Sequence, residues 1–202
     1  MRFLLFFLLL FSGTTYADKA AQAEYRRLAR DMERLSKRQV WQGVDKRFRE
    51  LQNTKESIEF EHCLIGAQAA QELGNMENVQ DRLQLALKVK RKKRVINWLS
   101  EINENYGRVT LKATSKGEVD LLPNEMPMDP IKNKSIVIAQ NRLQEKGEFS
   151  GLLPTGEYTF IGHPFTVDSG VDIKLAISPK QRKKGLEQPI ITRPDDIVID
   201  ED

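Results

Sequence analysis

The segment from Ile58 to Leu87 constrains the fold most strongly, because it carries two helical apolar stripes on either side of a turn signal. In the turn, Leu73-Gly74-Asn75, Gly74 can adopt positive φ after one helix and Asn75 can begin the next. Apolar and small residues recur at helical spacing on both sides: Cys63, Ala67, Ala70 and Leu73 before the turn, and Val79, Leu83 and Ala86 after it. This spacing places each set on one face of an α-helix. The segment therefore predicts a helical hairpin whose apolar faces meet.

The same spacing continues on both sides of the hairpin, so residues 18–105 are predicted to form five helices. A polar break at Ser36-Lys37-Arg38-Gln39 separates the first two, and the fifth begins near Arg94. The three further stripes are Ala21, Tyr25, Leu28, Met32 and Leu35; then Trp41, Val44, Phe48 and Leu51; then Val95, Trp98, Leu99 and Ile102.

A shift of 35 residues brings part of this helical pattern onto itself. The matched pairs are Met32 with Ala67, Val44 with Val79, Phe48 with Leu83, and Leu51 with Ala86. With Gly74 at the turn between helices, residues 20–104 resemble a pair of tetratricopeptide-like helical hairpins followed by a terminal helix. That resemblance implies a groove that binds a partner protein. An ordinary five-helix bundle is the alternative interpretation.

At Asn105-Tyr106-Gly107 the apolar spacing changes from helical to alternating, which predicts a β half over residues 106–178. Strands are expected at 108–112, 118–122, 157–161, 164–167 and 171–177, a helix at 131–146 that Gly147 ends, and a turn at 152–156. Because so few residues separate the last helix of the first half from the first strand, we expect the two halves to form one rigid unit. We expect the fifth helix and the helix at 131–146 to contribute to their interface.

Three short motifs in the β half carry a family resemblance: Gly107-x-Val109-x-Leu111, Leu153-Pro154-x-Gly156-x-Tyr158, and Phe165-x-Val167-x-x-Gly170 with Leu175 after it. In this order they resemble a PEGA-type or carboxypeptidase-regulatory-like β-sandwich over about residues 107–178. The resemblance implies a non-catalytic extracytoplasmic module. The helix at 131–146 departs from it, because such domains have a short loop there. The expected fold class is therefore α+β: an N-terminal array of helical hairpins followed by a small antiparallel β-sandwich with an inserted helix.

The two ends of the chain differ from the rest. Residues 1–17 have the layout of a secretory signal, with Arg2, an apolar run and small residues up to Ala17. We predict cleavage before Asp18 and a location in the periplasm or cell envelope, with an uncleaved anchor as the alternative. No second hydrophobic stretch follows, so no membrane span is expected after cleavage. Residues 179–202 lack periodicity and are predicted to be a disordered tail, whose short apolar segments can add a strand to a partner's sheet.

The charge of the chain is nearly balanced, at +3 overall, and Arg2 is the only charged residue of the expected signal, which leaves +2 after cleavage. Nucleic-acid binding is therefore not expected. His62, Cys63 and His163 are the only histidines and cysteine, and neighbouring positions 62 and 63 on a helix do not form a catalytic dyad. No cluster of metal ligands and no phosphate-binding loop is present in the sequence, so we expect neither a cofactor nor catalysis.

A dense basic run between the fourth and fifth helices is the candidate contact for an anionic partner: Lys90, Arg91, Lys92, Lys93 and Arg94. The alternative is a solvated helix end, where cations offset the dipole. The function expected from the whole chain is an exported, non-catalytic adaptor for protein–protein interaction in the bacterial periplasm or envelope. A carbohydrate- or peptidoglycan-binding module is the main alternative, although Tyr158, Phe160 and Phe165 are expected in the core rather than on a sugar platform. An envelope hydrolase is the third.

Overall fold

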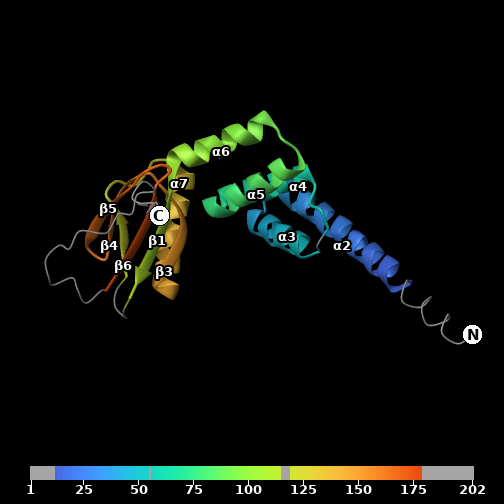
Figure 1. Ribbon diagram of the computed structural model, residues 1–202, viewed down its shortest axis with the longest axis horizontal. Coiled ribbons are helices and arrows are strands. Elements are labelled where there is room, and N and C mark those ends of the chain that lie inside the picture. The colour runs from blue at the N-terminus through green and yellow to red at the C-terminus, as the bar shows by residue number, and fades with distance from the viewer. Residues whose placement is uncertain (1–11, 55, 115–118, 179–202) are drawn as a thin grey trace, which may run out of the picture.

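The computed structural model describes residues 12–54, 56–114 and 119–178 and confirms the α+β class (Figure 1). The helices are α2 (Ser12–Lys37), α3 (Trp41–Asn53), α4 (Phe60–Glu72), α5 (Met76–Val89), α6 (Lys93–Asn105) and α7 (Pro130–Lys146). The strands are β1 (Tyr106–Ala113), β2 (Leu121–Pro123), β3 (Glu148–Pro154), β4 (Gly156–Phe160), β5 (His163–Val167) and β6 (Asp172–Ile177). The expected tail and residues 1–11 of the expected signal lie outside the described residues, and residues 12–17 begin α2.

The predicted helical stripes form the core of the helical half. Met32, Val44, Phe48, Leu51, Cys63, Ala67, Ala70, Val79, Leu83, Ala86 and Val95 are all fully buried in one cluster. Gly66 has a packing role there, because a Cβ on it would lie 2.4 Å from Cδ2 of the Phe48 ring. The absence of a side chain at Gly66 therefore lets α3 and α4 approach closely.

A buried charge also joins these helices, which the apolar pattern did not indicate. Arg82 of α5 donates from Nη2 to Asp45 Oδ1 of α3 at 2.5 Å and from Nη1 to the Gly66 carbonyl of α4 at 2.6 Å. Its guanidinium lies 4.4 Å from the centre of the Phe48 ring. Burial lowers the pKa of Arg82, and the hydrogen bond that Arg82 donates to Asp45 opposes that shift. Losing one partner would leave the other charge buried without compensation, so this pair specifies how three helices meet.

The β half consists of two three-stranded sheets, with strand orders β3-β1-β6 and β2-β4-β5. All pairs are antiparallel except β1 with β6, which is parallel and pairs Arg108 with Asp172. The sheets are thus mostly antiparallel, as predicted, and the parallel β1–β6 pair is the one pairing that departs from the expected antiparallel sandwich among the described strands. The chain leaves the first sheet after β3, forms the β4–β5 hairpin of the second, and returns on the other side of β1.

Strand β3 was not predicted, because residues 152–156 were interpreted as a turn. Its last four residues, Gly151 to Pro154, are all buried, so the alternation that marks a half-exposed strand is lost. Glycine and proline are also typical of turns, and they occur in or next to this strand at Gly147, Gly151 and Pro154. The other predicted strands and the helix at 131–146 are present, and Gly147 ends that helix with φ 72°. The strand predicted at 118–122 is the shorter β2, which begins at Leu121, and residue 118 lies outside the described residues.

The two halves are continuous, because α6 ends at Asn105 and β1 begins at Tyr106. Tyr106 and Leu152 from the β half are buried in the helical core. Helix α7 contributes Ile136, Ala139 and Leu143 to the β core and also contacts the turn between α4 and α5. At that contact, Ser135 Oγ donates to the Gly74 carbonyl at 2.9 Å.

Five more hydrogen bonds link the halves. They run from Lys134 Nζ to the Glu72 carbonyl at 2.8 Å, from Arg108 Nη1 to Glu77 Oε1 at 3.0 Å, from Arg108 Nη2 to Gln80 Oε1 at 3.1 Å, from Lys132 Nζ to Asn105 Oδ1 at 3.0 Å, and from the Thr155 amide to the Asn105 carbonyl at 2.9 Å. They come from α7, β1 and the β3–β4 turn. The halves are therefore joined by side-chain contacts as well as by the chain, as the short connection suggested.

Replacing Gly74 by Ala tests the contact between the α4–α5 turn and α7. Gly74 has φ 79°, and a Cβ there would lie 2.6 Å from Lys134 Cβ. We expect a loss of about 1–3 kcal/mol from backbone strain and a further loss of about 1–3 kcal/mol from overpacking. Denaturant unfolding measures the total.

The matched control is Gly170→Ala, because Gly170 has a similar φ of 73° but nothing within 4 Å of the added Cβ. It incurs the strain without the clash, so it should lose less stability than Gly74→Ala. Equal losses at the two positions would show that the turn does not need close contact with α7.

Candidate functional site

A groove between α4 and α6 is the candidate functional site. It has a volume of about 350 Å³ and is lined by Glu61, Leu64, Ile65, Gln68, Arg94, Val95 and Trp98. Leu64, Ile65 and Trp98 pack on the helical core with one side and remain partly exposed on the other. Partly exposed aliphatic and aromatic side chains lining one concave surface are typical of a binding site for an apolar group. We call this surface the α4–α6 groove.

A second hollow of about 200 Å³ lies further along α6, toward α7. Trp98 lines this hollow as well, together with Gln71, Met76, Glu101, Ile102, Asn105, Tyr106, Asp129, Ile131 and Lys132. Figure 1 shows why the two hollows follow one helix, since α6 runs over the helical half from the α5–α6 connection to β1. Trp98 therefore stands between the α4–α6 groove and the junction of the two halves.

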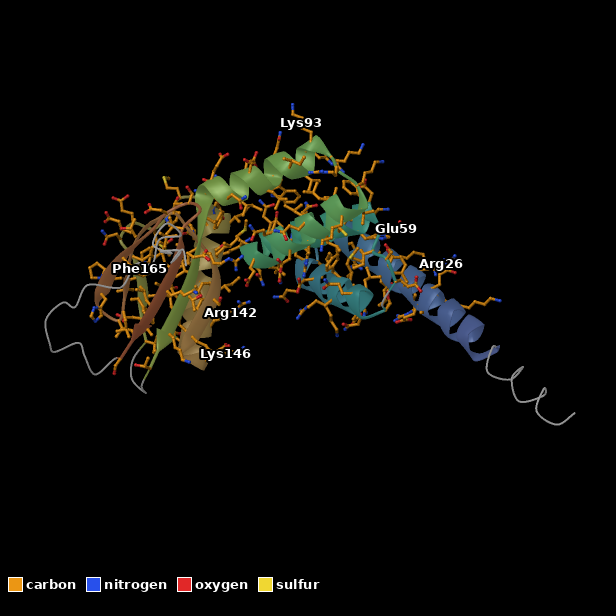
Figure 2. All side chains as sticks on the ribbon, viewed as in Figure 1. Arg26, Glu59, Lys93, Arg142, Lys146 and Phe165 are labelled. Atoms are coloured by element: carbon orange, nitrogen blue, oxygen red, sulfur yellow. The ribbon has the colours of Figure 1, made fainter. Side chains whose placement is uncertain are left out.

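The basic run that was predicted to contact an anionic partner lies at the end of the α4–α6 groove where α6 begins. Lys90 is the C-cap of α5, Lys92 is the N-cap of α6, and Lys93 and Arg94 occupy the first turn of α6. All of them are exposed, as is Arg91, and Lys93 projects away from the helix in Figure 2.

Arg94 is already engaged, because its Nη2 lies 3.5 Å from Glu61 Oε2 and its guanidinium 5.7 Å from the centre of the Phe60 ring. Within the described ranges, no ion pair involves Lys90, Arg91, Lys92 or Lys93. Among the described residues, these four cations are thus left without a carboxylate partner.

The helix dipole separates two parts of this basic run. Lys90 follows the last turn of α5, where a positive charge is favourable. Lys92, Lys93 and Arg94 stand at the N-terminus of α6, where a positive charge is unfavourable, and α6 has neither an acidic residue in its first turn nor a side-chain cap. The interpretation as a solvated helix end therefore explains Lys90 but not the other three. These three cations lower the stability of the first turn of α6, and such a local loss of stability is common at binding sites.

His62 and Cys63, the only adjacent histidine and cysteine in the sequence, contribute to the packing of helices rather than to a reactive pair. His62 is buried between α2 and α4, with Nδ1 2.9 Å from the Tyr25 hydroxyl and Nε2 3.1 Å from Glu33 Oε1. The Glu59 amide donates to the Tyr25 oxygen at 3.0 Å, so the tyrosine hydroxyl is left to donate to His62. Cys63 contacts the Ile58 carbonyl instead, and its burial raises the thiol pKa to about 11. The network joins two helices and leaves the thiol unactivated.

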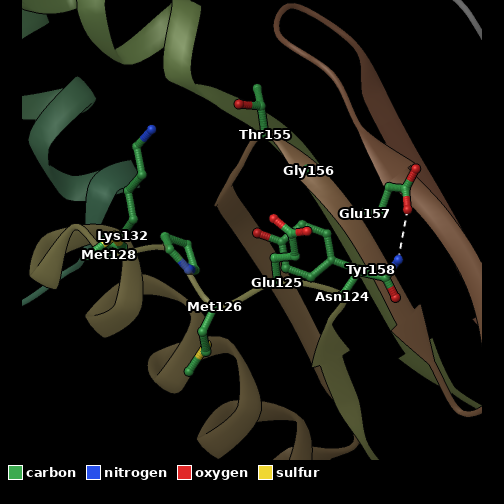
Figure 3. A pocket seen from close by; sticks show the side chains of 10 residues that line it. Asn124, Glu125, Met126, Met128, Lys132, Thr155, Gly156, Glu157 and Tyr158 are labelled. Atoms are coloured by element: carbon green, nitrogen blue, oxygen red, sulfur yellow. Dashed lines mark hydrogen bonds between the residues drawn. The ribbon is translucent and has the colours of Figure 1, made fainter.

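A larger hollow, of about 560 Å³, lies beside the loop from Asn124 to Met128 (Figure 3). Met126 and Met128 are exposed there, and Met128 almost completely, at 99%. Three polar side chains that line this hollow are bonded within the protein: Asn124 Nδ2 to Glu157 Oε2 at 2.8 Å, Lys132 Nζ to Asn105 Oδ1 at 3.0 Å, and the Tyr158 hydroxyl to the Pro154 carbonyl at 2.8 Å. The hollow therefore offers a ligand mainly two flexible thioethers and Glu125.

The aromatic residues of the β half were expected in the core, and they are buried. Tyr158, Phe160 and Phe165 are 3%, 0% and 5% exposed, and the rings of Tyr158 and Phe165 stack with centres 5.6 Å apart. His163, at the start of β5, is partly exposed. Over the part of the chain that the structure describes, no group of three or more His, Cys, Asp or Glu residues could hold a metal ion.

Comparison of the chain with protein-family models, curated proteins and solved structures returns no match. Among the described helices, none combines the length and the apolar character needed to cross a membrane. The case for a function therefore depends on the geometry of the α4–α6 groove and the basic run.

The sequence predicted part of this groove. The basic run and Trp98 were both identified, but Trp98 was expected to face inward at the junction with the first strand, whereas it is partly exposed and lines the groove. Leu64 and Ile65 were missed, because they lie outside the apolar stripe of α4. The apolar stripe of α4 is complete without these two residues. Extra aliphatic residues beside such a stripe are the sequence signal that would have indicated them.

Cys63 should be unreactive in the folded protein. With a pKa of about 11, only about one thiol in a thousand is ionised at pH 8, and the side chain is fully buried. We expect iodoacetamide to modify the native chain only as fast as it unfolds, and the urea-unfolded chain at once. Mass spectrometry of timed samples measures both rates. Rapid alkylation of the native chain would contradict the buried position.

Proposed function

We propose that this protein is an exported, non-catalytic adaptor that binds a segment of a partner protein in the α4–α6 groove. The observation that carries the proposal is the position of four exposed cations, without an ion-pair partner among the described residues, next to Arg94 at the end of a groove lined by Leu64, Ile65 and Trp98. Aliphatic side chains of a partner would bury against the apolar lining, and its carboxylates would meet the cations. The ligand is therefore an acidic segment that also carries aliphatic residues.

Both resemblances of the sequence support an adaptor. A tetratricopeptide-like array presents a groove to a partner protein, and a PEGA-type module accompanies such arrays at bacterial surfaces. The location in the periplasm or envelope depends on residues 1–17, whose layout is that of a secretory signal. A carbohydrate-binding role for the β half has less support, since Tyr158, Phe160 and Phe165 are buried and cannot stack on a sugar.

A displayed peptide library tests the groove without knowledge of the partner. We expect peptides selected on the full chain to combine acidic and aliphatic residues. Their affinity should fall at least about tenfold with Trp98→Ala, because a large aromatic contact is lost, and with Lys92→Glu/Lys93→Glu, because carboxylates would meet carboxylates. Fluorescence anisotropy of a labelled peptide measures each affinity.

The matched control for the charge change is Lys146→Glu/Lys174→Glu, two exposed lysines of α7 and β6, which should leave the affinity unchanged. The Lys92→Glu/Lys93→Glu variant should also be more stable than the parent, by about 0.3–1 kcal/mol per substitution, since acidic residues suit a helix N-terminus. Loss of binding with equal or higher stability would separate recognition from folding. Selected peptides that bind both charge variants equally would contradict the groove.

Export has its own test. Mass spectrometry of the protein isolated from its native cells should find Asp18 as the first residue, because the small residues up to Ala17 form the expected cleavage site. The fractionated envelope or periplasm should contain the processed form. A protein that retains Met1 and fractionates with the cytoplasm would disprove export.

A further inference from the structure

The chain itself contains a segment with the chemistry that the α4–α6 groove would select. Residues 195–202 read Asp-Asp-Ile-Val-Ile-Asp-Glu-Asp, with five acids around Ile197, Val198 and Ile199 and no cation. They lie outside the described residues. We propose that this acidic segment occupies the α4–α6 groove of the same molecule and competes there with the partner. The inference rests on the proposed function and deepens it by naming an intramolecular ligand.

The charges of the two surfaces are complementary. Beside Arg94, which lines the groove, the start of α6 and the connection before it carry Lys90, Arg91, Lys92 and Lys93, which are exposed and have no ion-pair partner among the described residues. The acidic segment carries five carboxylates, which suit both these cations and the uncapped N-terminus of α6. Its three central β-branched residues suit the apolar lining of Leu64, Ile65 and Trp98. Charge and apolar character thus match within one short segment.

The connecting chain is long enough for this contact. β6 runs parallel to β1 in a register that pairs Ile177 with Ala113, so it ends at the end of β1 away from α6. The route back covers β1, with 8 residues or about 26 Å, and α6, with 13 residues or about 20 Å. Residues 179–194 reach about 53 Å when fully extended at about 3.3 Å per residue. The acidic segment can therefore reach the first turn of α6 in its own molecule.

Tethering makes even a weak contact effective. The gain depends on the ratio of the segment's effective concentration to its intrinsic Kd. Where this ratio is about ten, the acidic segment fills about nine grooves in ten and weakens the apparent affinity for a partner about tenfold. The expected consequence is a groove that only a ligand stronger than the chain's own segment can occupy.

Zero-length carbodiimide cross-linking of the full chain tests the contact directly, because it joins only touching amines and carboxylates. We expect monomer bands in which Lys90, Lys92 or Lys93 is linked to an acid between Asp195 and Asp202, and we expect these links to disappear at high salt. The variant Ile197→Ser/Val198→Ser/Ile199→Ser keeps every carboxylate but loses the apolar contact. It should lower the yield of links several-fold, which a purely electrostatic attraction would not predict.

The second measurement is the affinity for a library-selected peptide, which should rise about tenfold in the same triple-serine variant. Absence of the links, links found only in covalent dimers, or an unchanged yield in the triple-serine variant would each overturn the proposal. If the selected peptide needs Lys92 and Lys93 but binds the parent and the triple-serine variant equally, the inference fails while the adaptor proposal stands. If no peptide binds either chain although the links form, the adaptor proposal fails instead.

Discussion

The contact between the α4–α5 turn and α7 is the constraint on which the arrangement of the two halves depends. Gly74 combines a positive φ of 79° with a close approach, since a Cβ there would overlap Lys134 and Ser135. Its carbonyl accepts the Ser135 hydroxyl at 2.9 Å. One residue thus ends a helix, turns the chain and receives the helix of the other half. No other amino acid satisfies all three requirements without strain.

The candidate site depends on the position of α6, which is held at both ends. α6 packs on α5 in the helical half, and at its other end it becomes β1 without a linker. β1 is the central strand of its sheet, and α7 packs on β3 beside it. Each half therefore holds one end of α6, although every residue that lines the α4–α6 groove is helical.

Stability and recognition have opposite requirements at the start of α6. Acidic residues there would favour the helix, yet Lys92, Lys93 and Arg94 occupy the first positions without a cap. The buried Arg82–Asp45 pair provides the contrast, because Arg82 bonds to both Asp45 and the Gly66 carbonyl and serves the packing of three helices. The buried pair holds the scaffold together. In the exposed run, Arg94 contacts Glu61, whereas Lys92 and Lys93 have no ion-pair partner among the described residues.

Neighbouring residues specify the local elements and the two core faces, because helical and alternating periods are local properties of a chain. Five helices, the inserted helix, most strands, the turn at Gly74 and the basic run could be predicted in this way. Three features depend on residues far apart in the sequence and emerge with the packing: strand β3, whose consecutive buried residues hide its period, the parallel β1–β6 pair, and the charge pair that holds Arg82 of α5 against Asp45. The packing also explains why Leu64, Ile65 and Trp98 line a groove, since a residue's exposure beside a filled core is determined by where the next helix lies.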